Sequence, residues 1–361
     1  MRSTDRRVVR MRLAAQRISA SDLATPASVV RWMTAMQAQD FAGATWSIGL
    51  RLPGSTVADV DAAILDRSIV RSWPMRGTLH FVVAEDLRWM LSLTSERLVK
   101  GALARRAALG LDERLLEGAR DASIAALEGG RILARDAMYD VFAGAGVSPD
   151  GQRGYHVLWY LSQTGTLCFG PPEGKQQTFV LAEEWIRNSR MLERDEALGE
   201  FVGRYFRSHG PASIRDFAWW SSTTLGDARI GLAVARESLS SIERDGEPLY
   251  FAAAADREPK RDGIRILPGF DEYLLGYQDR TPQLSAEHAE RIVPGGNGMF
   301  QSTIVNDGLV VGTWRRTERA RGVVVAAQPF SPLNATASKG FARESTAYAR
   351  FLGAKLIEIP S

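Results

Sequence analysis

Three short segments of related sequence recur along the chain and limit the folds that it can adopt. They read GTLHF from residue 77, GTLCF from residue 165 and GEPLYF from residue 246. Each begins with a glycine turn and continues as a short, aromatic, alternating segment, which is typical of a strand. The spacing between them is that of a small domain. The chain is therefore expected to contain three units of one kind.

Helical patterns precede the first of these strands. Thr25 and Pro26 predict an N-cap followed by proline at the first helical position. The segment 27–39 then carries apolar residues at helical spacing. A second helix is expected at 55–68, and two strands around a turn at 69–82. Two helices followed by a β-hairpin is the order of a winged helix-turn-helix domain.

The second and third units repeat this order. Helices are expected at 132–146 and 154–165 before the second strand, and at 211–222 and 224–237 before the third. Aromatic residues in these helices could stack on bases, but they lie within the apolar stripes. We therefore expect them to be core residues; they are Trp159, Tyr160, Trp219 and Trp220.

The predicted fold is α+β, with three tandem winged helix-turn-helix domains at residues 1–110, 111–192 and 193–361. The last part of the chain adds other elements. Residues 265–277 read as a strand entering a buried loop, and residues 302–316 as a hairpin turning at Asn306-Asp307-Gly308. That hairpin is expected to project, with a basic flank that includes Arg315, Arg316, Arg319 and Arg321. A strand at 323–329, a helix at 340–353 and a closing strand at 355–359 complete the prediction.

Composition narrows the class of protein. The net charge is only +3, and of the 45 basic residues five are lysine, so arginine dominates. Arginine suits phosphate contacts, but a GC-rich genome gives the same bias. A single cysteine, Cys168, excludes an internal disulfide and fits a reducing compartment. The N-terminus lacks the apolar core of a secretory signal, and no apolar run reaches the length of a membrane span. A cytoplasmic protein without membrane association is expected.

Several kinds of site are disfavoured. The four histidines, at 80, 156, 209 and 288, show no ligand spacing, so no metal and no cofactor is expected. The sequence has no phosphate-binding GxxxxGK[ST] loop, no GxGxxG fingerprint and no GxSxG elbow. The five lysines have polar or flanking surroundings, which disfavours a Schiff-base mechanism.

Gln37 and Gln39 form the most unusual candidate site. On a helix their side chains would be about 200° apart and could not share a pocket. The following residues, DFAGATW, contain helix breakers, so the helix could end here. Both amides could then face one cavity; the alternative is a polar helix end without a function.

Three other polar residues have two interpretations each. On a strand, His80 points away from Leu79 and Phe81, so it is expected at the surface, either as an ordinary polar residue or facing DNA beside Arg76. Asp271 and Asp279 bracket an apolar run and are expected to pair with arginines as structural braces rather than to act in catalysis.

Four segments together resemble a known family. They are MQAQ at 36–39, RSWPMRGTLH at 71–80, LPGFDEYLLGYQDR at 267–280 and TIVNDGLVVGTWRR at 303–316. Over roughly residues 8–358 the chain resembles the bacterial winged-helix DNA glycosylases of the AlkZ/YcaQ type. The resemblance implies a C-shaped arrangement of winged helices whose concave face receives DNA. Gln37-Ala38-Gln39 matches the two-glutamine form of the family's catalytic motif, which is associated with crosslink resistance.

The resemblance also implies a function. It predicts a monofunctional glycosylase that removes N7-alkylated purines from double-stranded DNA and unhooks interstrand crosslinks, for self-resistance or repair. The protein would act as a monomer at the nucleoid. The alternative is a non-catalytic winged-helix DNA-binding protein such as a transcriptional regulator, which would usually dimerise. The expected catalytic residues are Gln37 and Gln39, and the expected DNA contacts are Arg76, His80, Asn306, Arg315 and Arg316.

Overall fold

The computed structural model describes residues 3–255 and 260–357. The chain divides into two compact units, one formed by Met1–Val60 with Leu198–Ser361 and the other by Asp61–Ala197. We call them the discontinuous unit and the inserted unit. The boundaries fall within α4 (Val57–Leu65) and α11 (Arg194–His209). The predicted division into three domains is a different partition and stays a prediction.

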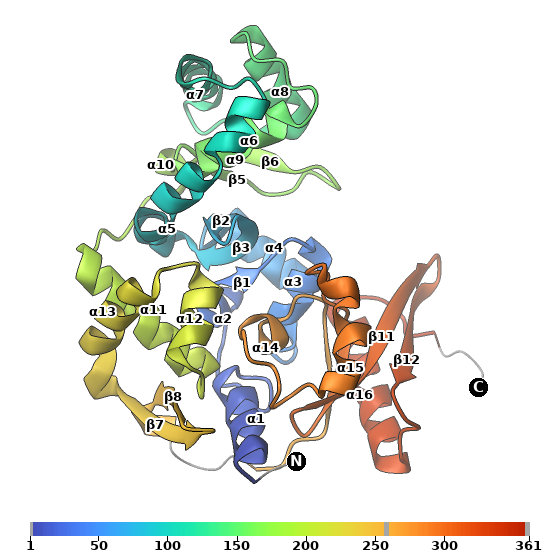
Figure 1. The fold of residues 1–361 in the computed structure, drawn as a ribbon. Helices are drawn as coiled ribbons and strands as arrows, with labels where there is room; N and C mark the ends of the chain where they lie inside the picture. Colours follow the sequence, from blue (N-terminus) through green and yellow to red (C-terminus); the bar gives the residue numbers. More distant parts are fainter. Residues whose placement is uncertain (1–2, 256–259, 358–361) are drawn as a thin grey trace. The chain divides into compact units, whose positions relative to one another are not determined.

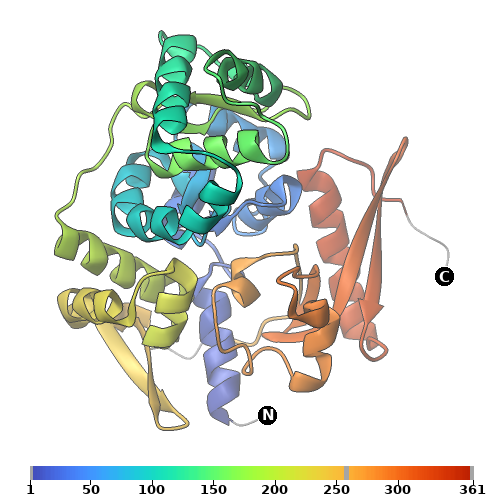
Figure 2. The same ribbon diagram turned by 45° about the horizontal axis from the view of Figure 1, so that its top comes forward.

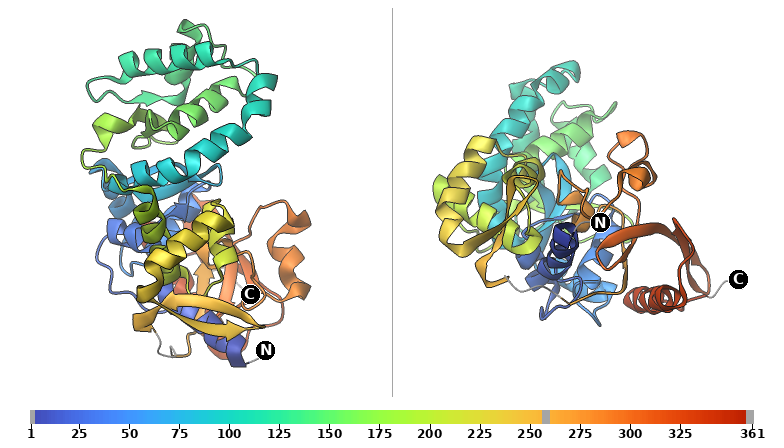
Figure 3. Two further views of the ribbon diagram at one scale, coloured as in Figure 1. Left: turned by 60° about the vertical axis from the view of Figure 1, so that its left-hand side comes forward. Right: turned by 60° about the horizontal axis from the view of Figure 1, so that its bottom comes forward.

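The inserted unit contains a complete winged helix. Its helices are α7 (Glu113–Leu127), α8 (Arg135–Gly144) and α9 (Arg153–Gln163), and its wing is the hairpin of β5 (Leu167–Phe169) and β6 (Thr178–Leu181). Figure 3 shows the helices of this unit, in cyan to green, gathered around its strands. The buried aromatic and aliphatic side chains of these elements share one core, which is why the segment is compact by itself.

The first hairpin joins the same sheet. β2 (Ile69–Met75) pairs antiparallel with β3 (Thr78–Val83), as predicted. β2 also pairs with β5 through Arg71 and Phe169, so the strands run β3-β2-β5-β6-β4, with β4 at Leu133–Ala134. The other helices of the inserted unit are α5 (Leu87–Gly101), α6 (Leu103–Ala108) and α10 (Ala182–Trp185).

The discontinuous unit contains a second complete winged helix. It consists of α11, α12 (Ile214–Ser221), α13 (Leu225–Ala235) and the hairpin of β7 (Leu239–Arg244) and β8 (Glu247–Ala252). Ser213 caps α12 through a reciprocal pair of hydrogen bonds with Asp216. The three glycine-led segments thus lie on β3, β5 and β8, and the predicted α+β class with tandem winged-helix order is confirmed.

The N-terminal segment folds as α1 (Ser3–Ala15), α2 (Pro26–Met33), β1 (Met36–Gln37) and α3 (Phe41–Gly49) (Figure 1). Thr25 and Ser28 form the reciprocal cap of α2, and Pro26 occupies its first turn, as predicted. The prediction of a helix to residue 39 was wrong, because α2 ends at Met33. The expected helix breakers after the motif instead begin α3. A Cβ on Gly43 would come within 2.6 Å of Asp40 Oδ2, so glycine lets the Asp40 side chain lie over the first turn of α3.

The C-terminal sheet runs β12-β11-β10-β9, with α16 (Ala335–Phe351) packed along it (Figure 2). Asn306 pairs with Leu309 across the predicted turn, and Asp307 and Gly308 both have positive φ, as two-residue hairpins require. The predicted strand at 323–329 is confirmed. The predicted helix at 340–353 begins earlier, as α16. In the described part of the predicted closing strand, Leu356 forms a single bridge with Val323, and Glu358 and Ile359 lie outside the described residues. The strands are β9 (Ile264–Leu267), β10 (Thr303–Asn306), β11 (Leu309–Arg319) and β12 (Gly322–Pro329).

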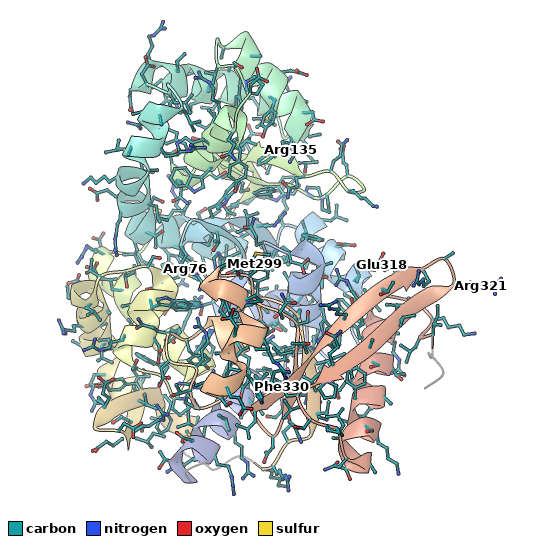
Figure 4. All side chains as sticks on the ribbon, turned by 45° about the vertical axis from the view of Figure 1, so that its right-hand side comes forward. Arg76, Arg135, Met299, Glu318, Arg321 and Phe330 are labelled. Carbon is teal, nitrogen blue, oxygen red and sulfur yellow. The ribbon has the colours of Figure 1, made fainter. Side chains whose placement is uncertain are left out.

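The hairpin that projects is not the predicted one. The β10–β11 turn is held against the first helix by an ion pair between Arg10 and Asp307. The long hairpin of β11 and β12 instead reaches away from the unit, with Glu318 and Arg321 at its free end (Figure 4). Contacts that hold the first turn lie far away in sequence, so the local pattern could not show which end is free. The remaining helices of the unit are α14 (Glu272–Leu275) and α15 (Ala286–Ile292), and short 3-10 helices lie at Ala84–Asp86, Arg236–Ser238, Ala253–Ala255 and Pro294–Gly296.

Candidate active site

Gln37 and Gln39 lie in a short extended segment between α2 and α3. Met36 and Ala38 are fully buried, whereas Gln37 is half-buried and Gln39 is exposed. This alternation is that of an extended chain, in which residues two apart share a side. Both amides therefore lie on the accessible side of the segment, the arrangement that the sequence allowed only if the helix ended before them.

A strained residue begins this segment. Thr34, the C-cap of α2, has φ 72° and ψ −54°, a region that a β-branched side chain rarely occupies. Its side chain is fully buried. Such a conformation, close to that of a γ-turn, costs about 1–3 kcal/mol and persists only where surrounding contacts enforce it. The chain thus turns abruptly from helix to extended segment just before Gln37.

A buried carboxylate, Glu272, contacts this segment. Its Oε1 accepts the main-chain N–H of Gln37 at 3.0 Å, and its Oε2 accepts the indole Nε1–H of Trp220 at 2.8 Å. Only 1% of Glu272 is exposed. Glu272 is the first residue of α14, so a helix from the C-terminal half of the chain lies directly against the motif.

The neighbouring residue Asp271 anchors the part of the chain that follows the motif. It forms a two-pronged ion pair with Arg51, with N–O distances of 2.8 and 2.9 Å, and accepts a hydrogen bond from Ser47 Oγ at 2.6 Å. Both charged side chains are buried. Ser47 belongs to α3 and Arg51 follows it closely, so the pair fixes the helix that follows Gln39. The expected pairing of Asp271 with an arginine is confirmed, and Asp279 likewise pairs with Arg244 at 2.8 Å.

His209 completes the buried polar cluster around Glu272. Its Nε2 lies 3.5 Å from Glu272 Oε2, and its Nδ1 lies 2.9 Å from Ser208 Oγ. The ring stacks on Tyr205 with an interplanar angle of 12°. Burial lowers the pKa of His209, and the proximity of Glu272 only partly offsets this effect. The imidazole is therefore harder to protonate than in water.

Arg316 lies near the motif, on the face of β11 that packs against α16. Its Nη1 donates to Tyr348 Oη at 3.0 Å, and Trp314 on the same face meets the Tyr348 ring edge-on. Although burial opposes the charged form, the Tyr348 hydroxyl and the Asp40 carboxylate hold the pKa of Arg316 above its usual range. Arg316 is thus a fixed cation close to the residue that follows Gln39.

Arg315 alternates with Arg316 and belongs to the opposite face of β11, where it is exposed. Asn306 lies at the other end of the β10–β11 pair. It is half-buried and lines a pocket of about 250 Å³ with His288, Phe330 and Asn334. The structure therefore does not bring Asn306 to the free end of the projecting hairpin, where the sequence expectation had put it.

Arg76 and His80 belong to the inserted unit and contact each other across the β2–β3 turn. Arg76 has a positive φ of 55° at the turn, and its Nη2 lies 3.0 Å from His80 Nε2. The Nδ1 atom of His80 lies 2.9 Å from the carbonyl oxygen of Thr78. The expectation that His80 is exposed was wrong, because its side chain is fully buried. Period-two alternation cannot show whether the second face of a strand is also covered.

Sequence reasoning missed Glu272, although a signal was present. Asp271 and Asp279 bracket the apolar run of FDEYLLGYQDR, and Glu272 lies inside that bracket, directly after Asp271. An acidic residue within a segment expected to be buried needs hydrogen-bond donors. This requirement was the signal in the sequence that Glu272 contacts other parts of the chain. His209 gave no such signal, because Tyr205 lies one turn before it on α11 but its other neighbours, Trp220 and Glu272, come from α12 and α14.

The chemistry available here is that of oriented amide dipoles rather than of acid–base transfer. Gln37 and Gln39 offer neutral donors and acceptors on the accessible side, while the carboxylate of Glu272 is buried behind the main chain. Within residues 3–255 and 260–357, no cluster of three or more histidine, cysteine or acidic side chains is placed to bind a metal ion. No helix in the described part of the chain is long and apolar enough to span a membrane.

Comparison with known proteins gave consistent matches. The family described as "DNA glycosylase AlkZ-like" matches residues 30–351. A curated protein of Streptomyces sahachiroi named "Interstrand DNA cross-link repair glycosylase" is 26% identical over 378 residues, covering 99% of this chain and 99% of that protein. The solved structure of Streptomyces sahachiroi DNA glycosylase AlkZ superposes with a TM-score of 0.82 at 25% identity, covering 99% of this chain and 100% of the other.

Proposed function

Because the chain belongs to the AlkZ-like family of DNA glycosylases, we propose that it hydrolyses the N-glycosidic bond of N7-alkylated purines and unhooks DNA interstrand crosslinks. The observation that carries the proposal is the pair of amides, Gln37 and Gln39, on one accessible side of a rigidly held extended segment. The relative from Streptomyces sahachiroi is named for crosslink repair, which supports the crosslink part of the proposal.

The chemistry of the substrate explains why neutral amides suffice. A purine alkylated at N7 is cationic, and the base leaves as a neutral molecule. No general acid is needed to protonate the leaving group, in contrast to ordinary glycoside hydrolysis. The enzyme must hold a water molecule and stabilise an oxocarbenium-like sugar. Oriented dipoles can do both, with a contribution of about 3–4 kcal/mol per group.

The two amides have different exposure and are assigned different roles. Gln39 is exposed and positions the attacking water. Gln37 is half-buried and orients the sugar–phosphate or shares the water. Gln37 is also the residue whose main chain Glu272 holds, so its position is the better defined of the two.

DNA is held by arginine. On β11, Arg315 is exposed and Arg316 is fixed against Tyr348, so Arg315 supplies a phosphate contact and Arg316 a positive charge near the motif. Arg76 in the inserted unit is a further contact, oriented by His80. For Asn306 and His80 the half-buried and buried positions favour indirect roles. The enzyme acts as a monomer on double-stranded DNA at the nucleoid.

The test is base release from two duplexes, one with N7-methylguanine and one with an N7-linked interstrand crosslink. Alkali converts each abasic site into a strand break, which gel electrophoresis quantifies. We expect release by the wild type, with a rate lower by about a hundredfold or more in Gln39→Ala. Release from both duplexes by Gln39→Ala at the wild-type rate would remove Gln39 from catalysis. DNA binding without release of base from either duplex would instead support the alternative, a non-catalytic DNA-binding protein such as a transcriptional regulator.

A further inference from the structure

Glu272 is buried in a position where a carboxylate is costly. Its side chain is 1% exposed, and a buried charge destabilises a protein unless donors surround it. Its oxygens accept from the main-chain N–H of Gln37 and from the indole N–H of Trp220, and His209 Nε2 lies 3.5 Å from Oε2. A site that needed only packing would be filled as well by an apolar residue. The carboxylate is therefore better explained by the hydrogen bonds that it accepts than by the volume that its side chain occupies.

The segment that contains Gln37 is strained at its start and needs contacts that keep its conformation. Thr34 lies three residues before Gln37 in a strained conformation with positive φ, and such strain relaxes unless the surroundings oppose it. On the other flank, Asp271 fixes Arg51 and Ser47. The consecutive acids Asp271 and Glu272 thus hold the chain after and within the Gln37-Ala38-Gln39 motif, both from the start of α14.

We propose that Glu272 is a positioning residue of the active site. By accepting the N–H of Gln37 it fixes the main chain of the extended segment, and thereby the direction in which the Gln37 and Gln39 amides point. This inference rests on the proposed function, because the amides are the groups assigned to the reaction. Glu272 itself remains behind the main chain and touches neither water nor sugar in this role.

The two donors make a specific test possible. A carboxylate has an acceptor oxygen for each donor, whereas the amide of Glu272→Gln has one oxygen and presents its NH₂ group to the other donor. Trp220→Phe removes the competing indole donor. In the double variant the amide oxygen is free to accept from Gln37, and the amide NH₂ no longer opposes the indole N–H.

The experiment measures single-turnover base release from N7-methylguanine duplex by the wild type, Glu272→Gln, Trp220→Phe and the double variant. We expect Trp220→Phe to stay within about threefold of wild type and Glu272→Gln to lose about ten- to a hundredfold, as misplacement of reacting groups does. The double variant should recover much of that loss. Affinity for intact duplex should change by less than about threefold, so the effect falls on the rate of the chemical step.

Hydrogen exchange of the segment 34–40, followed by mass spectrometry, gives a readout that does not need activity. Protection of this segment should be lost in Glu272→Gln and regained in the double variant, while protection of α16 stays unchanged. The inference would be overturned if the rate losses of the two single variants add in the double variant. It would also be overturned if Glu272→Gln releases base at the wild-type rate. If the wild type releases no base and protection still depends on Glu272, the proposed function fails and the positioning contact stands.

Discussion

Arg10 and Asp307 form a two-pronged ion pair, with Nε–Oδ1 at 3.0 Å and Nη2–Oδ2 at 2.8 Å. The pair joins α1 to the turn between β10 and β11. Tyr273 adds to this anchor by donating its hydroxyl to Gly308 O at 2.6 Å. The turn is therefore part of the packed body of the discontinuous unit, and the hairpin of β11 and β12 is left as the projecting element (Figure 1).

Replacing Arg10 with alanine should destabilise the protein. The pair is largely shielded, with side-chain exposures of 16% and 15%, and loss of hydrogen bonds to a charged group costs about 1.5–3 kcal/mol. Arg6→Ala, an exposed arginine on the same helix, is the matched control and should change the free energy of unfolding by less than about 0.5 kcal/mol. Urea unfolding measures both variants, and equal midpoints for the two would contradict the assignment.

Arg315 and Arg316 should differ in what they contribute. Arg315→Ala should weaken binding to undamaged duplex and reduce the slope of log K against log salt by about one. Arg316→Ala should also lower the free energy of unfolding, by about 1 kcal/mol, because it removes the bond to Tyr348. Fluorescence anisotropy at several salt concentrations, with denaturation of each variant, separates the two effects. An unchanged salt slope in Arg315→Ala would exclude the phosphate contact.

Replacing Thr34 with valine should reduce the rate of base release less than replacing it with glycine. Valine keeps the shape and removes a hydroxyl that is buried without a hydrogen-bond partner, so Thr34→Val should match or exceed the wild type in stability. Thr34→Gly permits the positive φ without strain but frees the segment before Gln37. We expect base release to fall by about tenfold or more in Thr34→Gly and to stay near wild type in Thr34→Val. A fully active glycine variant would show that rigidity here is not needed.

Stability should fall as the pH drops below the ordinary pKa of histidine. His209 has a lowered pKa in the folded state because of burial, so below about pH 6.5 the unfolded chain takes up a proton that the folded chain does not. The contribution of His209 to the free energy of unfolding is therefore present above pH 6.5 and is lost on acidification. The loss is no more than about 1.4 kcal/mol per pH unit. The groups facing it include Tyr205, Trp220, Tyr277 and Glu272.

Comparison with His209→Gln isolates this effect from the other histidines. The free energy of unfolding of the variant should depend less on pH between about 5 and 7 than that of the wild type. Urea titrations at a series of pH values give both curves. Parallel curves would mean that His209 binds protons equally well in both states.

Cys168 should be chemically inert in the folded protein. It is fully buried, and burial raises the pKa of its thiol to about 12, so almost no thiolate forms at neutral pH. A thiol reagent such as Ellman's reagent should react only after addition of denaturant, with one thiol titrated per chain. Rapid reaction in native buffer would contradict the burial.

Local signals in the sequence were sufficient for several elements. Thr25 and Pro26 mark the start of α2, and Asn306-Asp307-Gly308 marks a hairpin, because caps and turns depend on a few neighbouring residues. The three glycine-led strands likewise lie where the pattern put them. In each case the interactions that decide the structure lie within a few residues.

The candidate site could be predicted only in part, because distant residues shape it. The helical pattern runs on past Met33, but Thr34 turns the chain and Glu272, 235 residues away, holds Gln37 in an extended segment. Asp307 is held by Arg10 across 297 residues. No local pattern carries these partners, so the end of α2 and the free end of the hairpin could not be found from periodicity.

The division of the chain into a discontinuous and an inserted unit has a consequence for synthesis on the ribosome. Asp61–Ala197 forms its unit from one continuous stretch, all of which is made before α14. The Gln37 segment is made early, yet its partner Glu272 follows 235 residues later, a delay of roughly 10–50 s at ordinary rates of translation. The glutamine motif is therefore among the first parts of the enzyme to be made and among the last to be assembled, so a nascent chain that ends before α14 carries both glutamines without the contact that orients them.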